Sequence, residues 1–488
     1  MPANFTLTAV EVLRILPEII LSLVGTMVMV GEATMGERGR TLLRTLTIGG
    51  LVAALFGAII AYGSPGLAFS ELVIVDGFAT FFRILVIAVG ILTVLSSYQY
   101  FRREQHENGE FYALLLFSIV GQSVMVSAHE LIMVFIGLEI SSIATYVMAG
   151  YLRDDRRNNE SALKYFLLGS FATAFLLYGI AWIYGLAGST NLTEIRGILM
   201  NTATAPPALL TGMAAALMFV GFAFKVSAAP FQAWAPDVYQ GAPAPVSAFM
   251  SAAPKAAAFA ILLRVFGGAL QPVSETWEPI IWTSALLTMI IGNFAALQQT
   301  NIKRLLAYSS IAHAGYVLVA VTSNTEIGTA AAMFYLAAYS FMNIGAFAVV
   351  THMARGAEKY VQIDDYAGLA AKQPGTAAFL SIFLLSLIGV PLTAGFFGKF
   401  YIFKAALDAN LVWLTVLGLL NSAVAAYYYL RLLVVMYMNE PGEAAATVPA
   451  LTGGLRMTLW VTAAATLILG IFPSLVLNFA GSSTSLLK

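Results

Sequence analysis

Two lysines lie inside apolar segments, on either side of a proline-rich turn. Lys225 precedes Pro230 by five residues, and Lys255 directly follows Pro254 in the next apolar segment. A charge at the centre of a membrane costs several kcal/mol, so such a residue faces the protein interior or a hydrated cavity. Proline removes a backbone donor, and an interrupted helix is tolerated at that depth only where protein or water satisfies the freed groups. The combination predicts an ion pathway.

Helix geometry places both ammonium groups at a similar depth. Lys225 lies 16 residues before Gly241, which is about 24 Å along an unbroken helix, and a break would shorten this distance. Lys255 lies 14 residues after Gly241, which corresponds to roughly 15–20 Å because some of these residues form the turn. We therefore expect both lysines near the membrane midplane. The alternative is that each side chain extends to an interface, but neither residue is near the end of its segment.

Four further polar residues are candidates for the same pathway. Glu139 lies about nine residues into an apolar segment, where a lysine is its natural partner and hydrogen bonds to the following serines are the alternative. Lys399 follows an interruption at Pro391 and would end the row, although the end of its segment is near. His313 lies ten residues into a segment with several hydroxyls; it could carry protons at neutral pH or be a hydrogen-bonded core histidine. Lys164 opens a segment, so inward and interfacial placements both remain open.

Composition identifies the class of protein. The 488 residues are 59% hydrophobic and 10% charged, and repeated apolar runs exceed the ~18 residues that indicate a membrane helix. We expect an all-α polytopic membrane protein embedded in a lipid bilayer. The net charge of zero gives no reason to expect a nucleic-acid partner. The absence of cysteine excludes iron–sulfur ligation, and the four histidines lack ligand-pair spacing, so we expect no cofactor in this chain.

The apolar segments predict about fourteen spans, two of them broken. The segments near 207–240 and 376–405 are too long for one straight helix, and each contains proline or glycine. They are the seventh and twelfth spans, so they cross in opposite directions, and paired interrupted helices indicate an inverted-repeat transporter. We therefore expect an N-terminal three-helix segment, two inverted five-helix repeats and a C-terminal helix, at 1–110, 111–270, 271–440 and 441–488. The spans are expected near 11–31, 42–63, 73–97, 111–127, 130–150, 162–186, 207–240, 245–266, 278–298, 303–322, 328–353, 376–405, 411–438 and 455–478.

Basic residues alternate between the loops. Odd-numbered loops carry clusters such as Arg102–Arg103 and Lys303–Arg304, whereas even-numbered loops carry few lysines or arginines. By the positive-inside rule the odd loops face the cytoplasm. We therefore expect a multi-pass protein of the inner (plasma) membrane with both termini in the periplasm.

Two motifs carry a family resemblance. The pattern Ala-Pro-Phe-x-x-Trp-x-Pro-Asp-Val-Tyr-x-Gly-Ala-Pro-x-x-Val-x-Ala-Phe occupies 229–249, and a second motif occupies Asn301–Tyr316. In these stretches the chain resembles the antiporter-like membrane subunits of respiratory complex I, the NADH-quinone oxidoreductase. It is most similar to the N-type subunits, because of its Asp-Val-Tyr-Gln-Gly-Ala-Pro motif, the position of Lys399 at the end of the row of buried lysines and the absence of a long helix after the last span.

The resemblance implies proton translocation coupled to quinone reduction in partner subunits. It assigns a paired carboxylate and lysine to Glu139 and Lys225, with Lys255 connecting them to Lys399. Partner subunits would carry FMN and iron–sulfur clusters and bind quinone, and the neighbours would be other antiporter-like and small membrane subunits. One departure is Gln232, where relatives often have a titratable histidine. The alternatives are a subunit of an Mrp-type cation/proton antiporter and a purely structural membrane spacer, although a spacer would have no need of buried lysines.

Overall fold

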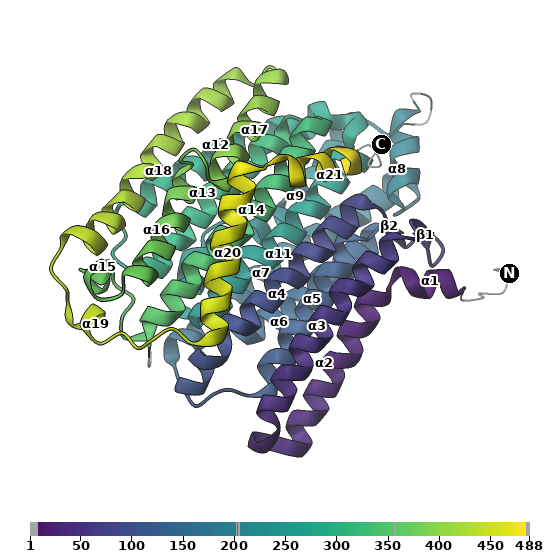
Figure 1. Ribbon diagram of the computed structural model, residues 1–488. Helices are drawn as coiled ribbons and strands as arrows, with labels where there is room; N and C mark the ends of the chain where they lie inside the picture. Colours follow the sequence, from purple (N-terminus) through teal and green to yellow (C-terminus); the bar gives the residue numbers. More distant parts are fainter. Residues whose placement is uncertain (1–7, 202, 204, 356–357, 485–488) are drawn as a thin grey trace.

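The computed structural model describes residues 8–484, except 202, 204 and 356–357. These residues form a bundle of helices whose axes are roughly aligned (Figure 1). Twelve segments are long and apolar enough to cross a membrane. One of them, 16–62, consists of two helices that pack side by side, and the broken pair α16–α17 adds a further crossing. The described residues therefore contain the fourteen crossings that the apolar pattern predicts. The long helices are α2 (Leu16–Met35), α3 (Arg40–Tyr62), α4 (Gly77–Arg103), α5 (Gly109–Val126), α6 (Leu131–Ala149), α7 (Arg156–Ala187), α9 (Ala208–Val226), α11 (Ala244–Arg264), α12 (Ser274–Leu297), α13 (Ile302–Thr322), α14 (Glu326–Ala354), α16 (Pro374–Ile388), α17 (Ala394–Asp408), α18 (Val412–Met438) and α20 (Gly453–Ile471).

Short elements at the ends of the bundle depart from the all-helical, span-only expectation. A two-stranded hairpin precedes α4, and the last predicted span, 455–478, is wrong at its end. α20 stops at Ile471, because Pro473 cannot donate a helical hydrogen bond, and the chain turns sharply into α21, shown in yellow in Figure 1. The short elements are α1 (Ala9–Arg14), β1 (Gly66–Ala68), β2 (Val73–Val75), α8 (Leu192–Met200), α10 (Trp234–Gly241), α15 (Leu369–Lys372), α19 (Glu443–Ala446) and α21 (Ser474–Thr484).

Both predicted breaks are present. α9 ends at Val226 and its continuation α10 begins at Trp234, with Ser227 in the left-handed region at φ 63°. α16 ends at Ile388 and α17 begins at Ala394, with Gly389 at φ 95°. A helix cannot continue through these conformations, so each break frees backbone carbonyls inside the membrane. Cationic side chains are suited to meet such carbonyls.

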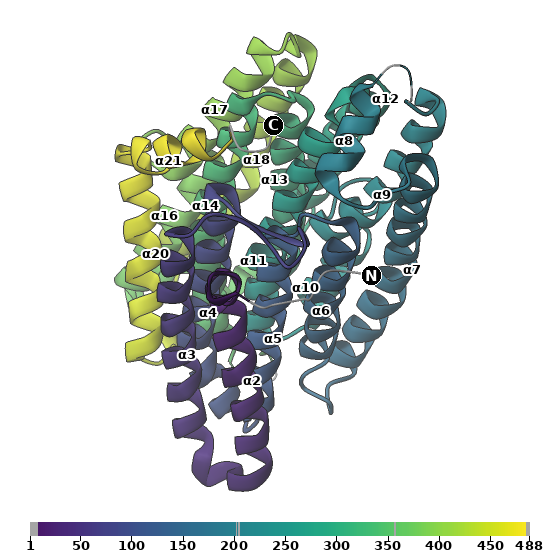
Figure 2. The ribbon, with the colours of Figure 1, turned by 90° about the vertical axis from the view of Figure 1, so that its right-hand side faces the viewer.

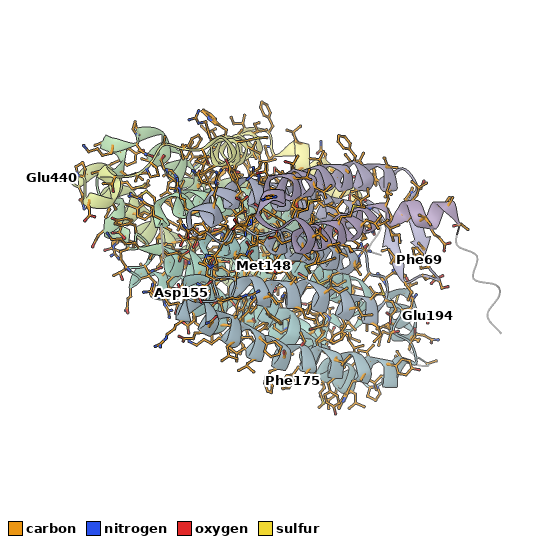
Figure 3. All side chains as sticks on the ribbon, turned by 90° about the horizontal axis from the view of Figure 1, so that it is seen from below. Phe69, Met148, Asp155, Phe175, Glu194 and Glu440 are labelled. Carbon is orange, nitrogen blue, oxygen red and sulfur yellow. The ribbon has the colours of Figure 1, made fainter. Side chains whose placement is uncertain are left out.

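The loops alternate between the two ends of the bundle. Figure 3 shows Asp155 and Glu440, which belong to odd-numbered loops, toward one end, and Phe69 and Glu194, from even-numbered loops, toward the other. The first and last described helices, α1 and α21, lie at the end that carries the hairpin and α8 (Figure 1). The terminal residues themselves, 1–7 and 485–488, lie outside the described residues.

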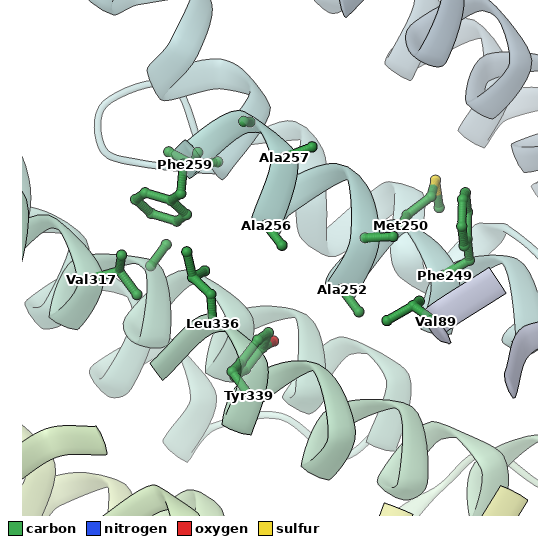
Figure 4. Close-up of a cluster of buried hydrophobic side chains, with 14 of the residues drawn as sticks. Val89, Phe249, Met250, Ala252, Ala256, Ala257, Phe259, Val317, Leu336 and Tyr339 are labelled. Atoms are coloured by element: carbon green, nitrogen blue, oxygen red, sulfur yellow. The ribbon is translucent and has the colours of Figure 1, made fainter. Parts of the chain in front are cut away.

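α11 is the central helix. Every residue from Ala244 to Arg264 is buried, and the helix is rich in alanine, which allows neighbouring helices to approach closely. Figure 4 shows Ala252 and Ala256 of α11 facing Leu336 and Tyr339 of α14. Helices at the edges, such as α7 and α20 in Figure 2, instead expose apolar side chains as a bilayer requires. The centre of the bundle is therefore where a buried polar residue is shielded most completely.

Candidate functional site

Lys225 lies in the last turn of α9, immediately before the first break. Its ammonium donates to the Ser142 hydroxyl at 2.9 Å and to the Tyr165 hydroxyl at 3.3 Å. It also lies over the rings of Tyr146 and Tyr165, at 5.7 and 5.4 Å from their centres. The cation is thus enclosed by hydroxyls and aromatic rings.

Glu139 does not form the direct ion pair with Lys225 that we expected. It lies on α6 one turn before Ser142 and is half-buried, and the described residues show no salt bridge between Glu139 and Lys225. Its Oε1 atom is buried without a hydrogen-bond partner within the described chain. Tyr146 lies seven residues after Glu139, on the same face of α6, and its ring lies beneath Lys225. α6 therefore carries Glu139 on the same face as Ser142 and Tyr146, the two side chains of this helix that contact Lys225.

Lys255 lies at the centre of α11 and is bound by α13. Its ammonium donates to the Ser310 carbonyl oxygen at 2.9 Å and also to the Ser310 hydroxyl. His313 follows Ser310 by one helical turn, and its Nδ1 and Nε2 atoms lie 2.5 Å and 3.2 Å from the hydroxyls of Tyr335 and Tyr429. The histidine is therefore hydrogen-bonded at both ring nitrogens, between helices α14 and α18.

Lys399 binds the free backbone carbonyls at the second break. Its ammonium donates to the carbonyl oxygens of Leu387 and Ile388, at 3.0 and 2.8 Å, and to the Ser422 hydroxyl at 2.8 Å. Because the two carbonyls end α16, the cation satisfies acceptors at the negative end of that helix. A cavity of about 430 Å³ between α17 and α18 includes Lys399 and opens to the surface beside Lys404.

One face of α13 joins these groups into a row. Ser310, His313 and Tyr316 are spaced by three residues, so they lie along the same side of the helix. Ser310 binds Lys255, and the Tyr316 ring lies 4.9 Å from the Lys399 ammonium. The structure therefore brings Lys255, His313 and Lys399 together along a single helix.

The stretch between Lys225 and Lys255 contains two buried tyrosine hydroxyls. The Tyr239 ring lies 6.0 Å from that of Trp234, which stacks on Tyr165, and the Tyr339 ring lies 5.1 Å from the His313 ring. The hydroxyls of Tyr239 and Tyr339 are buried without a hydrogen-bond partner in the described chain. A buried hydroxyl needs such a partner, so these positions suit bridging water.

Lys164 lies outside the row. Its side chain is 41% exposed at the end of the bundle and forms ion pairs with Glu160 at 2.7 Å and Asp237 at 2.8 Å. Arg83, on α4, also lies outside the row and pairs with Glu18 at 2.9 Å. Within the described residues no group of three His, Asp or Glu side chains is placed to hold a metal ion.

Sequence reasoning missed five partners of the buried charges and of His313: Tyr146, Tyr165, Tyr335, Tyr429 and Ser422. Tyr335 and Tyr429 come from helices far apart in the chain, and tyrosine in a membrane helix is not in itself a signal of chemistry. The available hint was the polar stripe of the segment that begins at Asn301, where hydroxyls recur around His313.

Comparison with known proteins places this arrangement in a family. Residues 128–425 match the family model described as NADH:quinone oxidoreductase/Mrp antiporter, TM. NADH-quinone oxidoreductase subunit N 1 of Solibacter usitatus is 62% identical over 100% of both chains, and subunit N of Trichlorobacter lovleyi is 46% identical over 97% of each.

Solved structures agree with these relatives. A chain of respiratory complex I from Thermus thermophilus is similar at a TM-score of 0.82, with 34% identity over 95% of this chain and 99% of that one. A chain of the Mrp complex from Dietzia has a TM-score of 0.86 over 99% of this chain and 98% of that one, but its 18% identity supports the shared fold alone. The chain therefore belongs to the NADH:quinone oxidoreductase/Mrp antiporter family of membrane proteins, in the branch of complex I subunits named N.

Proposed function

We propose that the chain is the proton-translocating N-type membrane subunit of an NADH-quinone oxidoreductase, and that protons pass along Lys225, Lys255, His313 and Lys399. The observation that carries this route is the single face of α13, which contacts Lys255 at Ser310 and approaches Lys399 at Tyr316. Each station is a group that can bind or release a proton, and hydroxyls lie between the stations. Glu139 is the acidic group of this route, one helical turn from the Ser142 hydroxyl that binds Lys225.

In this proposal the chain translocates protons, and electron transfer takes place in other subunits of a larger complex. The chain holds no redox centre in this proposal, and partner subunits carry FMN and iron–sulfur clusters and bind quinone. In this proposal the chain consists of an N-terminal segment 1–110, inverted repeats at 111–270 and 271–440, each of which contains one of the two breaks, and a C-terminal segment 441–488. Neighbouring antiporter-like and small membrane subunits cover the outer helices. The protein lies in the inner membrane, with both termini in the periplasm.

An Mrp-type antiporter is the second candidate. It shares the fold, but the relatives named subunit N are far more similar in sequence than the Mrp chain. Co-purification with flavin and iron–sulfur subunits would separate the two functions.

Replacing Lys255 by methionine tests the route. The side chain keeps its length but cannot bind a proton, so the assembled complex should reduce quinone while translocating fewer protons per electron. Lys372→Met is the control, because Lys372 is exposed in the short helix α15. Unchanged proton stoichiometry in the Lys255→Met complex would remove Lys255 from the route.

A further inference from the structure

One carboxylate outside the proton row connects helices from both proposed repeats. Asp237 lies on α10, the second half of the broken seventh span. Its Oδ2 accepts from the Lys164 ammonium at 2.8 Å, and its Oδ1 accepts from the Arg304 guanidinium at 2.6 Å. Lys164 belongs to α7 and Arg304 to α13. The half-helix is thus held from two sides by a single side chain.

Further hydrogen bonds hold the C-terminal turn of α10. From α7, Asn158 donates to the Gly241 carbonyl at 2.9 Å, and Ser161 donates to the Val238 carbonyl at 3.0 Å. From α13, the Lys303 ammonium donates to two carbonyls at the end of α10. A cation at a helix C-terminus is favourable. The polar contacts of α10 therefore extend from Asp237, in its first turn, to its C-terminal end.

The first residue of α10 reaches the environment of Lys225. Trp234, one turn before Asp237, stacks on Tyr165 with ring centres 4.4 Å apart and planes inclined by 8°. The Trp234 indole also donates to the Phe224 carbonyl at 2.9 Å, which ties α10 to the end of α9. The Tyr165 hydroxyl accepts from the Lys225 ammonium. A shift of α10 would consequently move a group that binds the buried lysine.

We propose that Asp237 is a positioning residue, which keeps Trp234 against Tyr165 and thereby keeps the Tyr165 hydroxyl on Lys225. Lys164 belongs to this clamp and not to the proton row. The ion pairs are partly exposed, since the Asp237 side chain is 36% exposed beside a polar cavity of about 200 Å³. Pairs of this kind are individually weak, so the clamp can open without unfolding the bundle. The proposal rests on the proposed route through Lys225.

The position of α10 can be measured by cysteine labelling. The chain contains no native cysteine, so a cysteine at the fully buried Val238 is a unique probe in this subunit. In the purified complex, Asp237→Asn should accelerate maleimide labelling of Val238→Cys by about 2- to 30-fold, the range expected for losing two partly exposed ion pairs. Glu160→Gln is the matched control, because it removes the other ion pair of Lys164 without touching α10. Equal labelling in the Asp237→Asn and control backgrounds would overturn the clamp.

Proton pumping separates positioning from proton transfer by Asp237 itself. The double variant Lys164→Gln/Arg304→Gln leaves Asp237 in place but removes both of its partners. The double variant should lower the number of protons translocated per electron, as Asp237→Asn should. Normal pumping by the double variant would mean that Asp237 itself carries protons, and this result would overturn the proposal. Asp237→Glu keeps the charge and should restore both protection and pumping, and its failure to restore either would also contradict the clamp.

Failure of the route has a different signature. Normal pumping by a Lys225→Met complex would refute the proposed proton route while leaving the labelling result intact. Asp237→Asn could assemble too poorly to measure, and Asp237→Glu then replaces it in the labelling experiment. The clamp predicts that Val238→Cys is labelled at the same rate in the Asp237→Glu and Glu160→Gln backgrounds, and faster labelling with Asp237→Glu would contradict it.

Discussion

Replacing Lys399 by methionine should block proton delivery and leave the complex assembled. In the structure its ammonium satisfies the carbonyls of Leu387 and Ile388 and the hydroxyl of Ser422. Methionine donates no hydrogen bond, so the two carbonyls at the end of α16 lose their partner. Each buried acceptor left unpaired costs ~1–3 kcal/mol, which amounts to about 2–6 kcal/mol for the two carbonyls.

A second contribution has the opposite sign. Burying an ammonium costs several kcal/mol of lost hydration, and methionine does not incur this cost. The two contributions are of similar size, so the net change in stability should lie within about 2 kcal/mol. The variant should therefore fold, but its side chain cannot bind a proton.

The assay is proton uptake or release per electron in vesicles that contain the assembled complex, with assembly measured separately on native gels. Lys404→Met is the matched control, because Lys404 lies on the same helix, five residues further along, and faces the same cavity without buried hydrogen bonds in the described chain. Full pumping by the Lys399→Met complex would remove this residue from the route. Loss of assembly in that variant alone would show that the energy balance above is wrong.

Three further outcomes follow. Glu139→Gln and Lys225→Met should each impair pumping, and the double variant should be little worse than either, because coupled residues are non-additive; losses that add would show independent action. Burial, reinforced by the Arg264 guanidinium, lowers the pKa of His129, which lies in the loop before α6. The unfolded chain therefore binds this proton first, and the folded state loses stability as the pH falls below about 6.5. His129→Gln, which keeps a partner for Thr193, should weaken this acid sensitivity in thermal melts, and an unchanged pH profile would contradict the reasoning. Reporter fusions at either terminus should be active only in the periplasm, and cytoplasmic activity would reverse the proposed topology.

The buried lysines and the broken helices were predictable because each violates a strong rule. A charge in an apolar segment and a proline in a membrane helix are both costly, so Lys225, Lys255 and Pro230 stand out in the sequence. The depth estimate for the lysines needed only the rise of a helix. The structure places both side chains in the interior of the bundle.

Partners were harder to predict because they depend on helix rotation and on competing local bonds. Asp76 begins α4 and accepts a hydrogen bond from the Ala79 amide at 2.6 Å, so its side chain is directed toward the helix end and pairs with Arg264. Arg83, two turns later, instead reaches Glu18 on α2. In the same way, the rotation of α6 brings Ser142 to Lys225 and leaves Glu139 half-buried.

The two breaks differ in what completes their backbone. At the first, hydroxyl and indole groups bind the free backbone atoms: Trp234 donates to the Phe224 carbonyl, and Thr288 accepts from the Ala229 amide. At the second, the donor is Lys399, and its three N–H groups match three acceptors. A neutral amine has only two N–H groups, so after loss of the proton the Ser422 hydroxyl must turn and donate to the nitrogen, and the two carbonyls lose their charge-assisted hydrogen bonds. Occupancy by a proton and backbone order are therefore thermodynamically linked at the second break, and hydrogen exchange at residues 387–394 should report the charge carried by Lys399.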